Sequence, residues 1–284
     1  MNETLCNTKP AEPTIANASV PVPAKGGQAK RQLSYTQLNM FLRCPRQYEY
    51  RYVYGLKVPP SGAMVQSRVW HQTVEFNYRQ KIRSHRDLPL GEMQEFFAAR
   101  FDVALASEEV AFEPGEKPGT LKDQGTAVVA AHHKTIAPEV RPLLVEEPFT
   151  VELGADFPYD LVGVWDLVER DGTIADNKAY RKMPYQEELD KDLQFTIYAL
   201  GFRVTRSEIE GGLRMDAIIK TKNPKAVQFH TRRTNGDCRW LLSLIEQVSK
   251  AITSGIFYPN PNGRHCTPRF CGYWDRCMGR KNWR

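Results

Sequence analysis

Three ionisable residues lie around a predicted hairpin in the middle of the chain. Asp171-Gly172 favours a tight turn between two apolar runs, which predicts two antiparallel strands. Residues two apart in a strand project from the same face, so Asp176 and Lys178 should point into one space. Antiparallel pairing across the turn would bring Asp166 beside them. The sequence therefore predicts two carboxylates and one ammonium group at the end of a hairpin.

A divalent cation suits this group of charges. Two adjacent carboxylates repel each other, and a hard cation such as Mg²⁺ or Mn²⁺ relieves the repulsion while water and substrate phosphate fill its other positions. The main-chain carbonyl of Asn177 could supply a further oxygen ligand. Lys178 could orient or deprotonate an attacking water, or stabilise negative charge on a phosphate. This is the chemistry of phosphodiester hydrolysis. The alternative to a catalytic site is a surface hairpin with an ordinary Asp–Lys pair.

The same residues resemble a known family. Asp166 followed by Asp176-x-Lys178 is similar to the D-x(n)-(D/E)-x-K core of the PD-(D/E)XK nuclease superfamily, and Gly163-Val164-Trp165-Asp166 resembles the G-x-[IV]-D form of its RecB-like branch. Gln194 and Tyr198, which begin sixteen residues after Lys178, resemble the Q-x(3)-Y motif of that branch. The resemblance covers residues 33–280. It implies that Asp166, Asp176 and Lys178 are catalytic, that Gln194 hydrogen-bonds near the metal or phosphate, and that Tyr198 holds the DNA strand.

A histidine on a predicted helix is a further candidate ligand. Apolar residues at helical spacing predict a helix over residues 62–83, and this helix contains His71. RecB-like nucleases carry a helical histidine after a small-residue segment, and Gly62 to His71 is similar to that pattern. The resemblance implies that His71 joins Asp166 and Asp176 as a metal ligand. A partly buried polar residue is the alternative, and Glu75 is a weaker candidate.

Other acidic and histidine residues receive structural interpretations. Glu146 and Glu147 resemble a glutamate that often precedes the hairpin in this family, but we interpret both as exposed charges at a strand edge. His132 and His133 are adjacent, and adjacent residues point in different directions on a helix. We therefore expect the histidine pair to lie on the surface.

The cysteines indicate a second metal centre. Six cysteines in a chain without an export signal favour metal or redox chemistry over disulfides. Cys266, Cys271 and Cys277 lie within twelve residues, and Cys44 beside a proline is the best candidate for a fourth ligand, whereas Cys6 and Cys238 lie outside the set. Four thiolates suit a [4Fe–4S] cluster or a structural Zn²⁺, and the spacing does not choose between them.

The distribution of these cysteines resembles the iron–sulfur RecB-like nucleases, which include CRISPR adaptation exonucleases, the AddB nuclease domain and related phage enzymes. In them one cysteine precedes the nuclease core and three follow it. The family spacing is commonly C-x(2)-C-x(5)-C, whereas this chain has C-x(4)-C-x(5)-C, so His265 is an alternative to Cys266 as a ligand. The resemblance implies an iron–sulfur cluster that joins the N- and C-terminal segments of the nuclease domain.

The bulk composition sets the class of protein. Of 284 residues, 41% are hydrophobic and 25% are charged, as in soluble globular proteins. No apolar run is long enough to cross a bilayer and no apolar signal-peptide core is present, so we expect a cytoplasmic protein without a membrane partner. A formal net charge of +6 is compatible with a polyanionic partner. We expect a disordered tail over residues 1–30 and a single nuclease domain over residues 31–284.

The pattern of elements predicts an α/β or mixed α+β fold, with a mixed sheet and helices on its faces. A capping box at Ser34 to Gln37 predicts a helix with Leu38, Phe41 and Leu42 on its apolar stripe, ended by Cys44-Pro45. The resemblance implies a restriction-endonuclease-like sheet. Strands are also predicted over residues 145–153, 213–220 and 226–231, and helices over 92–106, 120–136, 187–200 and 237–254, the last with Trp240 on its buried face.

These features lead to one expected function and two alternatives. We expect a metal-dependent DNA nuclease, an exonuclease acting on single-stranded ends, with Mg²⁺ or Mn²⁺ and a [4Fe–4S] cluster. DNA recombination or repair, phage DNA processing and CRISPR adaptation are the candidate pathways, with helicase, recombination or CRISPR integration proteins as partners. The first alternative is a non-catalytic DNA-end-binding subunit of a larger complex. The second is a zinc-stapled binding module.

Overall fold

The computed structural model describes residues 30–155 and 157–279. The predicted disordered tail, apart from Lys30, lies outside the described residues. The strands are β1 (Arg31–Ser34), β2 (Pro142–Val151), β3 (Tyr159–Glu169), β4 (Thr173–Tyr180), β5 (Gly212–Ile219) and β6 (Lys225–Thr231). The helices are α1 (Tyr35–Arg43), α2 (Pro45–Tyr48), α3 (Gly62–Ser84), α4 (Leu90–Ser107), α5 (Pro118–Thr135), α6 (Gln186–Asp190), α7 (Leu193–Arg206), α8 (Asn235–Thr253) and α9 (Trp274–Cys277), with a π-helical turn η1 (Glu49–Val53) and a 3-10 turn η2 (Ala137–Glu139).

The six strands form one mixed sheet, as the sequence predicted. Its order is β1-β3-β4-β5-β6, and β2 pairs with β3 outside this path. The β1–β3 and β4–β5 pairs are parallel, whereas β2–β3, β3–β4 and β5–β6 are antiparallel. The α/β class with a restriction-endonuclease-like sheet flanked by helices is therefore confirmed.

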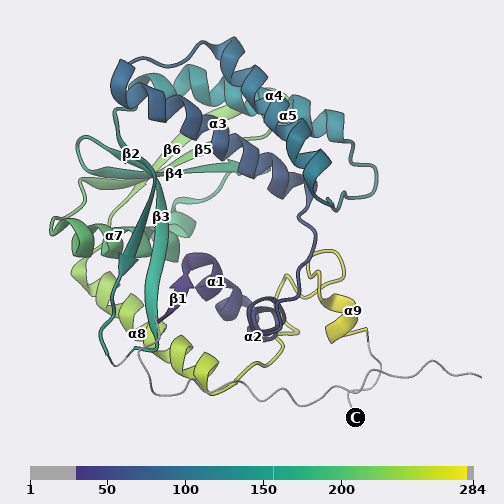
Figure 1. Cartoon of the computed structure of the whole chain (residues 1–284), viewed down its shortest axis with the longest axis vertical. Helices are drawn as coiled ribbons and strands as arrows, with labels where there is room; N and C mark the ends of the chain where they lie inside the picture. The colour runs from purple at the N-terminus through teal and green to yellow at the C-terminus, as the bar shows by residue number, and fades with distance from the viewer. Residues whose placement is uncertain (1–29, 156, 280–284) are drawn as a thin grey trace, which may run out of the picture.

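Helices cover both faces of the sheet (Figure 1). On one face, α3, α4 and α5 form an apolar core with side chains of the sheet that include Leu167 and Ala175. On the other face, α1, α7 and α8 pack over a second core that includes Trp165 and Ile174. Figure 1 also shows α9 and the C-terminal segment beside α2, at the far end from α4. The site described below lies between α3 and the sheet.

Local signals account for the start of the fold and for its central turn. Ser34 accepts a hydrogen bond from the backbone of Gln37, whose side chain accepts one from the Ser34 N–H at 2.7 Å, so the predicted capping box is present. Gly172 has a φ of 81° in the turn between β3 and β4, a conformation that glycine adopts without strain. β1, which precedes the capping box, was not predicted. It is only four residues long and takes its register from β3.

Three details of the predicted helices are wrong. The helix expected over residues 187–200 is broken between α6 and α7, where Asp192 caps the new helix by accepting from the N–H of Gln194 at 2.8 Å. The buried Arg233 guanidinium satisfies carbonyls at the break, at Leu189 and Asp192. Trp240 is 59% exposed, because the buried stripe of α8 runs through Leu241 and Ile245 instead. Leu42 is also exposed, at 40%.

No helix in the described part of the chain combines the length and the apolar character needed to cross a membrane.

Candidate active site

The predicted catalytic residues lie where β3 and β4 separate. These strands pair at Leu167 with Ala175 and at Val168 with Ile174. Continuing this register would place Asp166 opposite Asp176, but the ladder ends before them. Beyond that point β4 continues along β5, while the start of β3 pairs with β1 through Val162. The two strands therefore form a fork, and both carboxylates lie at its base.

The normal alternation of side chains breaks at Asp166. Trp165 packs in the core on the α7 side, and Leu167, two residues later, packs in the core on the α3 side. In a regular strand, two side chains that are two residues apart would lie on the same face. The irregularity leaves Asp166 half-buried beside α3, while its Oδ2 atom still accepts a hydrogen bond from the backbone N–H of Asn177 at 3.1 Å.

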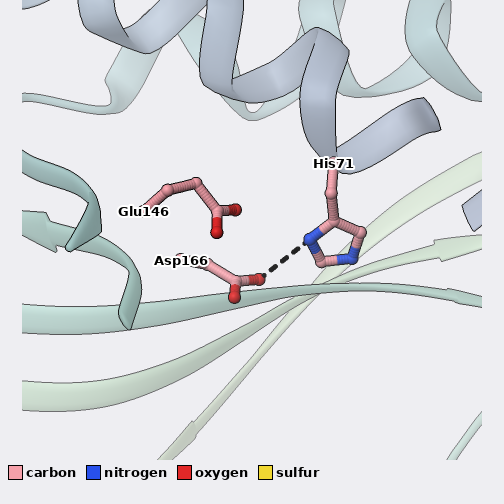
Figure 2. A group of neighbouring side chains, drawn as sticks. All are labelled: His71, Glu146 and Asp166. Carbon is pink, nitrogen blue, oxygen red and sulfur yellow. Dashed lines mark ion pairs between the residues drawn. The ribbon is translucent and has the colours of Figure 1, made fainter. Parts of the chain in front are cut away.

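Three side chains from three elements form a candidate metal site (Figure 2). One ligand atom from each of His71 on α3, Glu146 on β2 and Asp166 on β3 lies within 4.8 Å of the others. Figure 2 shows the two carboxylates and the imidazole pointing toward one another. His71 Nδ1 lies 3.2 Å from Asp166 Oδ2. The structure thus brings the predicted His71 to Asp166, although the helix and the strand are far apart in the sequence.

Glu146 corrects the interpretation of the sequence. We expected an exposed charge, but its side chain is half-buried and belongs to the metal site. The β2–β3 register pairs Val145 with Leu167 and Glu147 with Trp165, which places Glu146 opposite Asp166. Its φ of 46° is rare for a residue other than glycine, and such backbone strain concentrates at functional sites. Glu147 is exposed, as expected.

A second group of side chains joins β4 to α7. Lys178 Nζ lies 2.7 Å from Asp176 Oδ2 and donates to Gln194 Oε1 at 2.8 Å. Gln194 Nε2 in turn donates to Asp176 Oδ1 at 2.8 Å. The Tyr198 hydroxyl lies 3.2 Å from Asp176 Oδ1 and 3.4 Å from Asp166 Oδ1, so it connects the two carboxylates. The Q-x(3)-Y pair therefore positions the acidic residues directly.

Burial and charge set the protonation of this group. Burial raises the pKa of Asp176 to about 6, although the Lys178 charge opposes this shift. For Lys178, burial would lower the pKa, but the charges of Asp176 and Asp166 outweigh it and raise the pKa above its usual value. For His71, burial likewise lowers the pKa, but the hydrogen bond and charge of Asp166 raise it overall. Lys178 therefore remains an ammonium ion at neutral pH.

The candidate metal site is electrostatically frustrated without a cation. Burial, together with the Asp166 charge, raises the pKa of Glu146 to about 7. Burial also raises the pKa of Asp166, but the hydrogen bond and charge of His71 lower it overall. Two carboxylates that share one space repel each other, and a divalent cation would remove that cost.

His132 also departs from the expected surface position. It is 1% exposed, its Nε2 atom lies 3.3 Å from the Tyr78 hydroxyl, and burial lowers its pKa to about 4. The buried side chain of Asn177 hydrogen-bonds with it on the α3 side of the sheet. A neutral histidine under β4 therefore supports the strand that carries Asp176 and Lys178. His133 is half-buried, with its Nε2 atom 2.7 Å from the Leu88 carbonyl, and Glu75 pairs with Arg79 outside the metal site.

Comparison with known families matches residues 32–278 to the PD-(D/E)XK nuclease superfamily. This range contains the whole fork, its carboxylates and Lys178. The chain belongs to the PD-(D/E)XK nuclease superfamily. None of the curated proteins compared with it matches.

The chain was also compared with solved structures. A crystal structure from Eubacterium rectale, of a protein named provisionally as an exonuclease, has a TM-score of 0.55 and 13% sequence identity, covering 81% of this chain and 84% of that one. A second structure, of the protein SSO0001, is 12% identical over 89% of each chain, with a TM-score of 0.41. At this identity the first likeness shows a shared fold.

The four predicted cluster cysteines of this PD-(D/E)XK nuclease line one small pocket. Cys44 lies between α1 and α2, and Cys266, Cys271 and Cys277 come from the C-terminal segment. Burial raises the pKa of Cys271 and Cys277, and neighbouring thiols of the set raise it further. His265 also lines this pocket. Cys238 lies elsewhere, buried in α8 beside Arg203.

Replacing Glu146 with Gln should stabilise the metal-free nuclease at pH 8. The pKa of Glu146 is about 7, against an ordinary value of 4.5, so the folded state holds this proton more tightly than the unfolded state. The resulting stabilisation is complete below about pH 4.5 and is lost as the pH rises through about 7. Because the side chain is partly exposed, we expect a gain of only about 1 kcal/mol, or about 2–4 °C in the melting temperature.

Melting curves in EDTA at pH 5 and pH 8 would measure this effect, with Glu147→Gln as the exposed control on the same strand. Mn²⁺ should then stabilise wild type more than Glu146→Gln, because only wild type keeps the Glu146 carboxylate as a ligand. A Glu146→Gln protein that melts at or below the wild-type temperature in EDTA at pH 8 would contradict the claim that the Glu146 charge destabilises the metal-free site.

Proposed function

We propose that this chain is a metal-dependent DNA nuclease that hydrolyses phosphodiester bonds. The observation that supports this most strongly is the fork itself. There the ligand atoms of His71, Glu146 and Asp166 converge beside the Asp176–Lys178 pair. A relic site that only grips DNA ends would have no need for so many buried, mutually repelling charges, which are costly to maintain.

The metal ligands in this proposal are Asp166, Asp176, His71 and Glu146, with the main-chain carbonyl of Asn177 as a further oxygen. The residues fit a cation because ligand atoms of His71, Glu146 and Asp166 lie within 4.8 Å of one another. Burial, helped by the Asp166 charge, also raises the pKa of Glu146, as expected where negative charge is crowded. Carboxylate and carbonyl oxygens favour Mg²⁺ or Mn²⁺. When bound, such an ion supplies Lewis-acid polarisation of the phosphate and an acidified water.

Lys178 acts as a cation in this mechanism. The charges of Asp176 and Asp166 favour its ammonium form, which donates hydrogen bonds. Gln194 holds the ammonium group through its Oε1 and Asp176 through its Nε2, so both are fixed by one amide. A fixed ammonium beside the scissile phosphate stabilises the charge that develops in the transition state.

A groove leads from this site toward β1. It is lined by Asp166, Gln194 and Tyr198 at one end and by Tyr35 and Thr36 at the start of α1. Its volume of about 500 Å³ would hold a nucleotide at a strand end. Together with the exonuclease name of the Eubacterium rectale relative, this supports exonuclease action on single-stranded DNA ends.

Linear and circular substrates would test this proposal. With Mn²⁺, wild type should shorten end-labelled linear single-stranded DNA stepwise and leave circular single-stranded DNA intact, and EDTA should stop the shortening. Cleavage of the circle at a comparable rate would overturn exonuclease action while retaining a nuclease. Binding of DNA ends without cleavage under any of these conditions would favour the non-catalytic end-binding subunit.

We also propose that the four cysteines hold a [4Fe–4S] cluster. Within the described residues, the only group of three or more candidate ligands whose atoms all lie within 4.8 Å of one another is the His71 site, so no three of the four thiols lie that close together. Thiolates around one Zn²⁺, each about 2.3 Å from the ion, would lie closer together. The wider spacing supports an iron–sulfur cluster over zinc.

A bound cluster would join the two ends of the fold. The segments already touch: Gln47 Nε2 lies 3.9 Å from Cys271 Sγ, and the Tyr273 hydroxyl donates to the Leu56 carbonyl at 2.7 Å. Asn260 donates to the Arg43 carbonyl at 3.0 Å. The position of Cys44 and the C-terminal cysteines, together with Gln194 and Tyr198, supports placement in the RecB-like iron–sulfur branch.

A further inference from the structure

A basic groove lies on the opposite arm of the fork from the groove beside β1. It has a volume of about 590 Å³. Its walls come from the segment that leads into α5, which includes Lys117, and from the ends of β4 and β5, which lead into Arg181 and Lys220. Glu116 is the acidic residue among its lining side chains. By contrast, Asp166 is the charged residue among those lining the groove beside β1.

Lys220 is held in this groove without a carboxylate partner. Its Nζ atom donates to Gln66 Oε1 at 3.1 Å, and no ion pair of Lys220 within 4.0 Å occurs among the described residues. Burial lowers the pKa of Lys220, and the Arg181 charge lowers it further. A half-buried ammonium group near a second cation is stabilised when an anion joins them.

Buried Gln66 fixes the position of Lys220 at the groove. The side chain is 3% exposed, and its amide nitrogen donates to the Leu121 carbonyl at 2.6 Å while its oxygen accepts from Lys220. The amide therefore ties Lys220 to Leu121 at the start of α5, and both of these residues line the groove. Arg181 lies 3.9 Å from Glu116 and its side chain is 63% exposed, which leaves its guanidinium accessible to a ligand.

Two elements connect this groove to the catalytic residues. Arg181 follows Lys178 by three residues at the end of β4, a separation of about 10 Å at about 3.3 Å per residue. On α3, Gln66 precedes His71 by five residues, or about 7.5 Å of helix. A nucleic acid strand carries one phosphate per about 3.4 Å of duplex axis, so such distances span a few nucleotides.

We propose that Arg181, Lys220 and Lys117 bind backbone phosphates of the DNA strand a few nucleotides from the scissile bond. This inference rests on the proposed nuclease function and adds the path of its substrate: the strand runs from the basic groove past Lys178 and Asp166 into the groove beside β1. Phosphate contacts fix the register of a strand without reading its sequence.

Salt-dependent binding would test this proposal. Anisotropy of a labelled short oligothymidylate in EDTA gives the slope of log affinity against log salt for wild type and for Lys220→Met, Arg181→Gln and Lys220→Arg. Each lost contact should reduce the slope by about 0.7, and Lys220→Arg should keep it. Arg239→Gln changes an exposed residue of α8 on the other face of the sheet; it is the matched control and should leave the slope unchanged.

The outcomes separate this proposal from the proposed function. If Lys220→Met and Arg181→Gln keep the wild-type slope and still cleave DNA, the groove is not a phosphate-binding site, and the proposed nuclease function is unaffected. A reduced slope in these variants, with wild type unable to cleave DNA, would support the groove as a DNA site and overturn the nuclease.

Discussion

Lys178→Met should cleave single-stranded DNA about 10²–10³-fold more slowly than wild type at saturating substrate and metal. Loss of one fixed charge that stabilises a transition state has an effect of this size. The reduction should lie in kcat rather than in KM, because Lys178 is held by Asp176 and Gln194 next to the carboxylates and away from the basic groove. Single-turnover rates with Mn²⁺ would measure it.

Two variants make this result interpretable. Lys250→Met removes an exposed lysine on α8 that pairs with Glu246, and it should retain the wild-type rate. Lys178→Arg keeps the charge but not the geometry of the ammonium group, so it should recover only part of the activity. Wild-type turnover by Lys178→Met, with metal dependence intact, would contradict the role assigned to Lys178.

Loss of the cysteine site should weaken the whole fold. Cys271→Ser purified without oxygen should lack the brown absorbance of an iron–sulfur cluster and should melt about 10 °C below wild type. A bound group that links two segments stabilises the folded state by its binding free energy. A loss of about 4 kcal/mol, at a few °C of melting temperature per kcal/mol, corresponds to this decrease. Visible absorption, iron content and melting curves would measure it.

Cys238→Ser is the matched control for this prediction. It changes a buried cysteine outside the pocket, so the protein should keep its iron content and its colour. Wild-type protein that contains zinc and no iron would contradict the cluster and favour the zinc alternative. Wild-type protein that binds neither metal would contradict any metal centre at the four thiols.

The sequence predicted those parts of the site that depend on local pattern. The hairpin turn at Asp171-Gly172, the adjacent Asp176 and Lys178, and the Q-x(3)-Y pair all follow from short spacings, because strands alternate and helices repeat within a few residues. The capping box at Ser34 is local in the same sense. The family resemblance then supplied the correct fold, since the sheet order itself cannot be derived from such spacings.

The parts that were missed depend on register and on tertiary contacts. Glu146 lies in the metal site because the β2–β3 register places it opposite Asp166 and because its backbone adopts a positive φ. Neither property is visible in a strand whose pairing partner is unknown. His132 is buried because Tyr78 and Asn177 come to it from other elements, which a single helical pattern cannot show.

The break between α6 and α7 has a similar origin and a functional consequence. Residues 187–200 have a continuous helical pattern, yet Asp192 caps a new helix, and the buried Arg233 guanidinium donates hydrogen bonds to the free carbonyls at the break. The new start aims Gln194 at Lys178 and Asp176. Local helix propensity was overridden by a contact with a residue about forty positions away.

The metal dependence of cleavage tests the central claim most directly. Single-turnover cleavage of end-labelled single-stranded DNA would be measured across a Mn²⁺ titration for wild type and Asp166→Asn, with metal content followed in parallel. We predict no wild-type cleavage in EDTA, saturation of the rate with Mn²⁺, and an Asp166→Asn protein that neither binds the ion at those concentrations nor cleaves. Equal cleavage by wild type with and without metal, or by Asp166→Asn, would contradict a catalytic metal site at the fork.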